Sequence, residues 1–276
     1  MNQFKIAILG GGNIGTSLAK GLIASKQFSY EEILISEKRE PRTEHLKSLG
    51  FHVTDNNHEA VSRSEIFVMS VKPQQFRTLA DEIKNSVTSE HIIISTISGI
   101  TCTEMESILG EVPIFRVMPN IAVEICESMT CISFRNSESR HEERVLSIFD
   151  QMGKTIIIPE EMMEAATVIG ACGIAFALRF IRAMSQGGIE IGFDSEMSQL
   201  ITAQTVKGAS GLIIKTGNHP EREIDRVTTP QGITISGLNE MEHRGMSSAI
   251  IRGLITSFNK LENLALKSQI QNYNKT

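Results

Sequence analysis

A glycine-rich turn near the start of the chain has the residue types and the spacing of a nucleotide-binding loop. Gly10, Gly12 and Gly15 follow the G-x-G-x-x-G pattern, between an apolar run over 4–9 and a helical pattern. In such a turn the first glycine permits the tight bend, the second lets a pyrophosphate approach the backbone, and the third lets the helix pack close on the strand. Free N–H groups at the helix start then face the phosphates. We therefore predict a dinucleotide site held by Gly10, Gly12, Asn13, Ile14 and Gly15.

Charged residues just past the next predicted strand bear on the choice of dinucleotide. Glu37 stands where an acidic residue commonly binds the adenine ribose 2′-hydroxyl, which favours NAD(H). Lys38 and Arg39 follow at once, with Arg42 close behind, and their charges suit the 2′-phosphate of NADP(H). The residues alone leave both cofactors open, and solvated charges at a helix start are the alternative for Arg42.

A second loop is predicted to reach the same edge of the sheet. Val71, Lys72 and Pro73 end the apolar run over 66–70, and a proline there stops the strand and starts a helix. This places Val71 and Lys72 at the carboxyl edge, where the ligand lies in a doubly wound sheet. The structural alternative for Lys72 is a lysine whose apolar stem covers the sheet edge.

A third group of residues, over 227–238, has the signals of a helix start. Thr229 is a good N-cap and Pro230 a good first helical residue. Such a start suits a carboxylate, and the Thr234 hydroxyl stands beside it. The N–H groups predicted to be unpaired there belong to Gln231, Gly232, Ile233 and Thr234. The local alternative is an ordinary capped helix.

These groups are carried by two parts of different character. In the first part, β-rich runs alternate with helical stretches, which predicts an α/β fold with a mostly parallel, doubly wound sheet. The predicted strands are 5–9, 32–36, 51–53, 66–70, 92–96, 114–117, 130–134 and 155–158, and the predicted helices are 14–25, 41–49, 73–84 and 141–152. We predict a dinucleotide-binding domain over 1–160.

The second predicted domain, 161–276, is all-helical. Its predicted helices are 161–193, 195–216, 229–242 and 246–266. These stretches are apolar on more than one face, and a helix that is apolar all round must be buried. We expect them to complete their core against a second copy of the chain, which predicts a homodimer or larger homo-oligomer. Burial against the first domain is the alternative.

Composition excludes several classes of protein. The net charge of -5 and the pI near 5.9 argue against a nucleic-acid partner. The four cysteines include no Cys-x-x-Cys pair and the seven histidines are scattered, so no metal site is expected. We find no signal peptide and no uninterrupted apolar run of about 20 residues, and therefore expect a cytoplasmic protein with no membrane partner.

Taken together, these runs resemble the pyrroline-5-carboxylate reductase family. The resemblance covers about residues 4–265 and is most specific over 228–242 (TTPQGITISGLNEME). It implies a Rossmann-type NAD(P)-binding domain followed by a helical domain that intertwines in a dimer, often within larger rings. It also implies reduction of 1-pyrroline-5-carboxylate to proline by hydride transfer, with NADP(H) favoured and NAD(H) possible. The other matching runs are 10–15, 71–74, 98–100, 117–120 and 187–189.

The resemblance also assigns roles to single residues. The substrate carboxylate would sit on the helix start formed by Gly232, Ile233 and Thr234. The Thr234 hydroxyl would lie near the imine nitrogen and help to protonate or orient it, which makes Thr234 the candidate catalytic residue. Asn57, after the third predicted strand, would touch the adenosine end of the cofactor.

Several residues on the substrate side depart from the family pattern. Cys126 and Gln231 stand where the pattern has glycine. The other departures are Ile121, Ala122, Ile174 and Arg182. Two alternatives therefore stay open, namely a related reductase of another imine or carbonyl substrate and a non-catalytic NAD(P)-binding paralogue.

Overall fold

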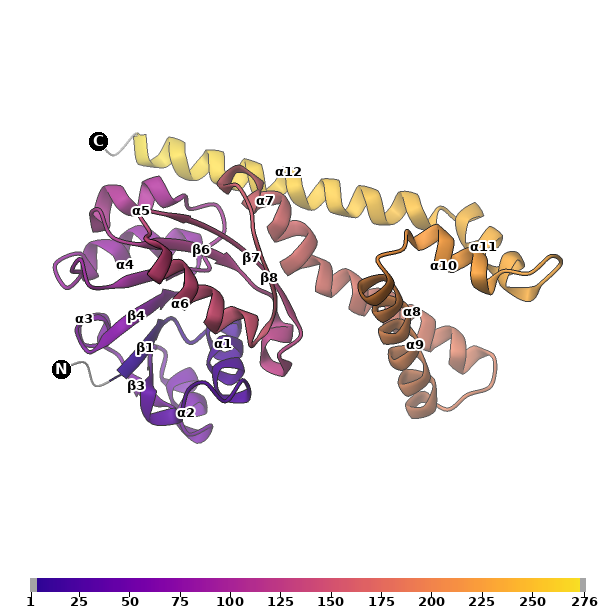
Figure 1. Cartoon of the computed structure of the whole chain (residues 1–276), viewed down its shortest axis with the longest axis horizontal. Helices are drawn as coiled ribbons and strands as arrows, with labels where there is room; N and C mark the ends of the chain where they lie inside the picture. The colour runs from indigo at the N-terminus through magenta and orange to yellow at the C-terminus, as the bar shows by residue number, and fades with distance from the viewer. Residues whose placement is uncertain (1–3, 274–276) are drawn as a thin grey trace. The chain divides into compact units, whose positions relative to one another are not determined.

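A computed structural model of the protein describes residues 4–273, with side chains over 4–263. Residues 1–3 and 274–276, at the ends of the two predicted domains, lie outside the described residues. Over the described chain the strands form an eight-stranded sheet in the order β3-β2-β1-β4-β5-β6-β7-β8 (Figure 1). The strands are β1 Phe4–Leu9, β2 Ile33–Ser36, β3 His52–Thr54, β4 Ser64–Met69, β5 Ile92–Ser95, β6 Ile114–Met118, β7 Ser128–Arg135 and β8 Gly153–Ile157.

Most of the sheet is parallel, as predicted. Strands β1 to β6 pair in parallel, β7 runs antiparallel to β6, and β8 pairs in parallel with β7. The strand order reverses beside β1, whose neighbours are β2 and β4. Parallel strands on either side of such a switch point leave a crevice at their carboxyl ends, where ligands bind.

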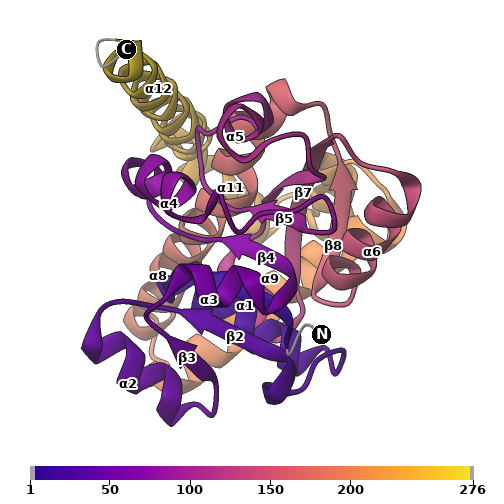
Figure 2. The same cartoon turned by 90° about the vertical axis from the view of Figure 1, so that its left-hand side faces the viewer.

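Helices cover both faces of the sheet because successive strand residues point to opposite faces. Ile6 and Ile8 pack in one core with helices α1 (Asn13–Ala24), α2 (Glu40–Ser48) and α6 (Ser139–Asp150). Ala7 and Leu9 belong to a second core with α3 (Asn57–Ser62), α4 (Phe76–Ile83) and α5 (Cys102–Leu109). Figure 2 shows α4 and α5 on the same side of β5. Burial on both faces explains why the strands read as nearly continuous apolar runs.

The rest of the chain is helical, as predicted. Its helices are α7 Met163–Ala166, a π-helical turn Thr167–Cys172, α8 Gly173–Glu190, α9 Ser195–Thr216, α10 Pro220–Val227, α11 Ile233–His243 and α12 Met246–Tyr273. The sequence patterns do not predict α10. Packing divides the chain into two compact units: unit 1 holds the residues up to Cys172 and those from Ser257 on, and unit 2 is Gly173–Thr256.

Unit 2 has almost no core of its own. Over its described side chains no apolar residue is buried, whereas the polar residues Ser198, Thr202 and Glu223 are. Large apolar side chains such as Leu178 and Leu200 are more than half exposed. Exposed apolar area of this extent marks a surface that another molecule covers.

One helical stretch also has the length and composition of a membrane span. Over Glu160–Glu190 the mean hydropathy reaches 1.6, and 11% of the apolar window is buried. A helix that packs against a second copy of the chain has the same composition, because both surroundings are apolar. The predicted absence of a membrane partner therefore stays a prediction.

Candidate functional site

A pocket of about 970 Å³ opens at the carboxyl ends of the parallel strands of unit 1. It is lined by Gly10, Gly12, Asn13, Ile14, Ser36, Glu37, Lys38, Arg39, Arg42, Asn57, Ser70, Val71, Lys72, Gln74, Gln75, Thr78, Leu79, Glu82 and Thr96. The structure thus brings together all the predicted cofactor residues except Gly15 and Pro73, which are next to lining residues in the first turn of α1 and at the start of the turn Pro73–Gln75. Among all the lining side chains four are basic and two are acidic, so the pocket suits an anionic ligand.

The three glycines of the turn meet three different requirements. Gly10 has φ 111°, and a Cβ there would lie 2.4 Å from the Ser70 carbonyl oxygen. A Cβ on Gly15 would lie 2.0 Å from the Gly10 carbonyl oxygen. A Cβ on Gly12 would meet nothing within 4 Å and would occupy open space. The first and third glycines therefore serve the fold, and the second keeps a space clear.

That space lies at the start of α1. Gly12 is the N-cap residue, and no side chain caps the helix. The first N–H groups of α1 are accordingly available to an acceptor, and they carry the positive end of the helix dipole. A helix start without a side-chain cap, beside the open space at Gly12, suits the pyrophosphate of a dinucleotide.

Glu37 is a buried carboxylate at the rim of this turn, and it is 7% exposed. Its Oε2 accepts the Gly11 N–H at 3.1 Å and Arg39 Nη2 at 2.9 Å. Its Oε1 accepts the Arg39 N–H at 2.9 Å and Arg39 Nε at 3.0 Å. Burial by itself raises the pKa of Glu37, but the hydrogen bonds and charge of Arg39, with the Gly11 N–H, leave the pKa below its ordinary value.

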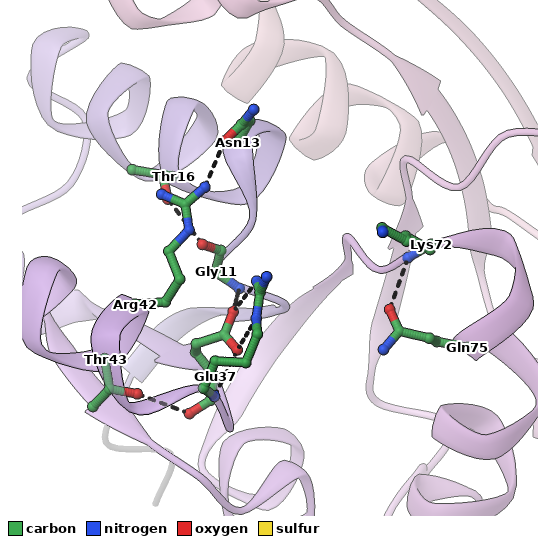
Figure 3. Close-up of polar contacts among 9 residues, drawn as sticks. Gly11, Asn13, Thr16, Glu37, Arg42, Thr43, Lys72 and Gln75 are labelled. Atoms are coloured by element: carbon green, nitrogen blue, oxygen red, sulfur yellow. Dashed lines mark hydrogen bonds and ion pairs between the residues drawn. The ribbon is translucent and has the colours of Figure 1, made fainter.

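Arg42 lies across the mouth of the same turn (Figure 3). Its Nη2 donates to Asn13 Oδ1 at 2.5 Å. Lys72 and Gln75 lie on the other side of the pocket in this view, where the Lys72 N–H donates to the Gln75 side chain at 3.3 Å. Pro73 begins the short 3₁₀ turn Pro73–Gln75 that precedes α4, as expected of a proline after a strand.

A polar network that sequence reasoning missed lines the wall formed by α3 and α4. Ser36 Oγ donates to Asn57 Oδ1 at 2.6 Å, and Asn57 Nδ2 donates to Glu82 Oε2 at 3.1 Å. Lys38 Nζ contacts both carboxylate oxygens of Glu82, at 3.2 and 3.1 Å. An acidic residue in the last turn of a helix opposes the helix dipole. The place of Glu82 in the last turn of α4 is therefore a sequence signal that its side chain has a partner outside this helix.

The predicted substrate residues lie at the start of α11 in unit 2. The helix begins at Ile233 with Gly232 as N-cap, so the prediction that Thr229 caps it and Pro230 starts it is wrong. The Gly232 N–H instead donates to the Thr229 carbonyl oxygen at 2.9 Å, because Pro230 occupies the second position of a tight turn. The unpaired N–H groups therefore start at Ile233, and the Thr234 side chain is exposed in the first turn.

The glycine at 232 serves this turn. A Cβ there would lie 2.5 Å from Thr229 Oγ1 and 2.9 Å from its carbonyl oxygen. The neighbouring Ile233 is 92% exposed, so the helix start is open.

Two departures from the family pattern stand at unusual backbone positions. Cys126 ends the 3₁₀ turn Ile121–Ile125 with φ 57°, and Gln231 has φ 60°. Both lie in the left-handed region that favours glycine. The backbone at these two positions therefore has the conformation of a glycine turn although glycine is absent. The other departures are Ile121 and Ala122 in that 3₁₀ turn, and Ile174 and Arg182 on α8.

The comparisons with known proteins agree with this geometry. Residues 160–264 match the family model for pyrroline-5-carboxylate reductase dimerisation, and residues 5–99 match the model described as NADP oxidoreductase coenzyme F420-dependent. Pyrroline-5-carboxylate reductase 1 of Dictyostelium discoideum is 47% identical over 96% of the chain, which spans half of that relative's length. Pyrroline-5-carboxylate reductase 2 of the same organism is 43% identical over 94% of the chain and 92% of its own length.

More distant relatives extend this result. Pyrroline-5-carboxylate reductase of Methanosarcina acetivorans is 33% identical over 97% of the chain and 100% of its own length. The crystal structure of Plasmodium falciparum pyrroline carboxylate reductase with NADP bound is 25% identical, with a TM-score of 0.86 over 96% of this chain and 99% of that one. By these relatives and by its two-part fold, the chain belongs to the pyrroline-5-carboxylate reductase family.

Proposed function

We propose that the chain reduces 1-pyrroline-5-carboxylate to proline with NADPH as the preferred reductant and NADH as a possible one. The observation that carries this proposal is the pocket at the switch point of the sheet, in a chain that belongs to this family. Reduction adds a hydride to the imine carbon and a proton to the imine nitrogen. The cofactor supplies the hydride when bound, and the chain supplies binding, orientation and the proton path.

The turn after β1 is proposed to hold the pyrophosphate. Its N–H groups from Gly12 to Gly15, among them those of Asn13 and Ile14, are placed for this at an uncapped helix start. The fit rests on the open space at Gly12, which a side chain would fill. Val71, Lys72 and Pro73 are proposed to border the cofactor on the opposite side.

The adenosine end is proposed to lie among Glu37, Lys38 and Asn57. The pocket has more basic than acidic side chains, which supports NADPH because of its additional phosphate. Arg42 contributes to this preference, since the partner of its guanidinium in the structure is the neutral amide of Asn13. The Plasmodium falciparum relative with NADP bound is consistent with this choice.

The substrate carboxylate is proposed to sit on the N–H groups at the start of α11. Ile233 and Thr234 provide those groups, while Gly232 forms the turn that leaves them free. A helix start attracts a carboxylate through these donors and through the helix dipole. The Thr234 hydroxyl is the candidate to orient the imine nitrogen or to pass it a proton.

The helical part is proposed to form a homodimer or a larger homo-oligomer. The support is the match of 160–264 to a dimerisation model, together with the lack of fully buried apolar side chains in the described part of unit 2. We retain 1–160 as the dinucleotide-binding domain and 161–276 as the dimerisation and substrate domain. A cytoplasmic location without nucleic-acid or membrane partners stays a prediction.

The test of the proposed function is an assay of NADPH consumption by the purified chain with 1-pyrroline-5-carboxylate, alongside a cofactor titration and light scattering. The proposal expects turnover by an oligomer. Binding of NADPH without turnover of this or other cyclic imines would favour the non-catalytic alternative. Turnover of a different imine alone would favour a related reductase.

A further inference from the structure

Two carboxylates line the adenosine end of the pocket, and their hydrogen bonding differs. A carboxylate offers about four acceptor positions. Glu37 receives four donated bonds, three from Arg39 and one from the Gly11 N–H. It cannot accept a bond from a ribose hydroxyl unless one of these is broken. Glu37 is the residue expected to bind the ribose because of its place after the second strand, but the protein already fills its acceptor positions.

Glu82 has a different set of partners. Asn57 Nδ2 donates to it at 3.1 Å, and Lys38 Nζ contacts both oxygens at 3.1 and 3.2 Å. The Lys38 side chain is 60% exposed and the Glu82 side chain 26%, so solvent reaches this ion pair from the lysine side. Exposed ion pairs are weak, because solvent screens them and both side chains lose freedom. A phosphate group, which carries more charge than a carboxylate, is therefore able to compete with Glu82 for Lys38.

The Lys38–Glu82 pair lies where the adenosine of the cofactor is expected. Lys38 follows Glu37 directly after β2, which is where the adenosine 2′ position lies in a dinucleotide fold. Lys38, Asn57 and Glu82 all line the pocket. The amide of Asn57 connects Glu82 to Ser36, the last residue of β2. Glu82 is therefore tied to the end of β2, where the cofactor's 2′ substituent is expected.

We propose that Glu82, rather than Glu37, is the carboxylate that sets the response to the 2′ substituent, and that it limits the preference for NADPH by holding Lys38. This inference rests on the proposed function for its cofactor. A 2′-phosphate must take Lys38 from Glu82, whereas a free 2′-hydroxyl leaves the pair in place. Loss of the Glu82 charge should therefore strengthen binding of 2′-phosphorylated ligands and leave binding of the others nearly unchanged.

The test uses the full chain with two adenosine ligands that lack nicotinamide, 2′,5′-ADP and 5′-AMP, titrated by calorimetry or by displacement of NADPH. In Glu82→Gln, the ratio of the 5′-AMP Kd to the 2′,5′-ADP Kd should rise about three- to fivefold, the upper part of the range for a lost exposed charge interaction. Lys38→Met should lower this ratio by a similar factor. In the Lys38→Met background, Glu82→Gln should no longer raise it.

Asp81→Asn is the matched control. Asp81 lies on the same helix and pairs with Lys84 at 3.1 Å, outside the pocket lining. The control changes the net charge equally and should leave the ratio within about twofold. The inference is overturned if the Kd ratio is the same in Glu82→Gln as in Asp81→Asn. It is also overturned if Glu82→Gln raises the ratio by the same factor in the Lys38→Met background.

The outcomes separate this inference from the proposed function. If Glu82→Gln raises the Kd ratio as expected but the parent chain does not reduce 1-pyrroline-5-carboxylate, the inference is supported and the proposed function is overturned. If the parent chain reduces 1-pyrroline-5-carboxylate but Glu82→Gln leaves the Kd ratio unchanged, the proposed function is supported and the inference is overturned. A parent chain that binds neither adenosine ligand nor NADPH overturns both.

Discussion

The Glu37 carboxylate accepts the backbone N–H of Gly11 at 3.1 Å, which ties the residue after β2 to the glycine turn after β1. The same carboxylate holds the Arg39 guanidinium through both of its oxygens. Glu37 thus serves to fix the geometry of the turn and to orient Arg39. We propose that this structural role takes the place of the direct contact with ribose that the position of Glu37 in the sequence predicts.

This relationship predicts a pH-dependent effect of Glu37→Gln on stability. At pH 7 the variant should lose about 1–3 kcal/mol, because bonds from a charged donor to the carboxylate are weakened. The folded-state pKa of Glu37 is lowered, so its stabilisation is complete above the pKa of the unfolded state and is lost as the pH falls through the folded-state pKa. The difference in Tm between parent and variant should therefore be largest near neutral pH and should shrink in acid.

Thermal unfolding at a series of pH values measures this difference. Asp81→Asn is the control, because Asp81 pairs with Lys84 at an exposed site and should change stability by less than about 0.5 kcal/mol. A difference that grows as the pH falls would contradict the account of Glu37.

Gly12→Val should abolish tight cofactor binding while the protein stays folded. A Cβ at Gly12 would meet no protein atom within 4 Å, so the loss of stability should be below about 1 kcal/mol. The same side chain would fill the space kept for the pyrophosphate, and loss of even one charged hydrogen bond costs about tenfold or more in affinity. Cofactor titration and thermal unfolding measure the two effects.

Gly15→Ala provides the contrast to Gly12→Val. Its Cβ would lie 2.0 Å from the Gly10 carbonyl oxygen, so this variant should lose stability as well as binding. The assignment of Gly12 fails if Gly12→Val binds NADPH as tightly as the parent.

Gln231→Gly should be at least as stable as the parent, although glycine usually destabilises. Gln231 has φ 60°, which costs a non-glycine residue about 1–2 kcal/mol. Relief of that strain offsets the greater freedom of glycine in the unfolded chain, about 0.4–1 kcal/mol. Gln151→Gly makes the same change at φ -80° and should lower the Tm. Equal losses in the two variants, measured by thermal unfolding, would show that the turn at Gln231 is not strained.

Thr234→Ala should lower kcat/KM for 1-pyrroline-5-carboxylate and leave NADPH affinity unchanged. Loss of a positioned proton donor costs about 10²-fold or more, and loss of one hydrogen bond to a charged group costs about tenfold to a hundredfold. The pH profile separates the two roles, because a lost proton donor changes the shape of the profile and a lost orienting bond only scales it. Thr234→Ser keeps the hydroxyl and should retain most activity. Full activity in Thr234→Ala would move the substrate site elsewhere.

The sequence was sufficient for the sheet and for about half of the residues that line the pocket, because these depend on local patterns. Each of the eight predicted strands overlaps a strand of the structure, and Gly10, Val71 and Asn57 reach one pocket through the ordinary topology of a doubly wound sheet. The start of α11 was misplaced by the same local reasoning. Pro230 is equally suited to the first turn of a helix and to the second position of a tight turn, and the Gly232 N–H decides for the turn.

Contacts between distant residues were beyond sequence reasoning. Lys38 and Glu82 meet only when the loop after β2 and the last turn of α4 come together in the folded chain. Arg116 lies within β6 at 1% exposure, where a charged residue is unexpected, and it pairs with Glu160 and Glu164 at 3.0 and 3.1 Å. A buried charge requires such partners. No local pattern indicates where along the chain they lie.

The transfer of hydride itself is the most direct test of the account. The purified chain would be given 1-pyrroline-5-carboxylate and NADPH with deuterium at both C4 positions of the nicotinamide, and the product analysed by mass spectrometry and NMR. We expect proline with one deuterium on the ring carbon that was part of the C=N bond, and loss of that product in Gly12→Val. Binding of NADPH by the parent chain without formation of deuterated proline would contradict it.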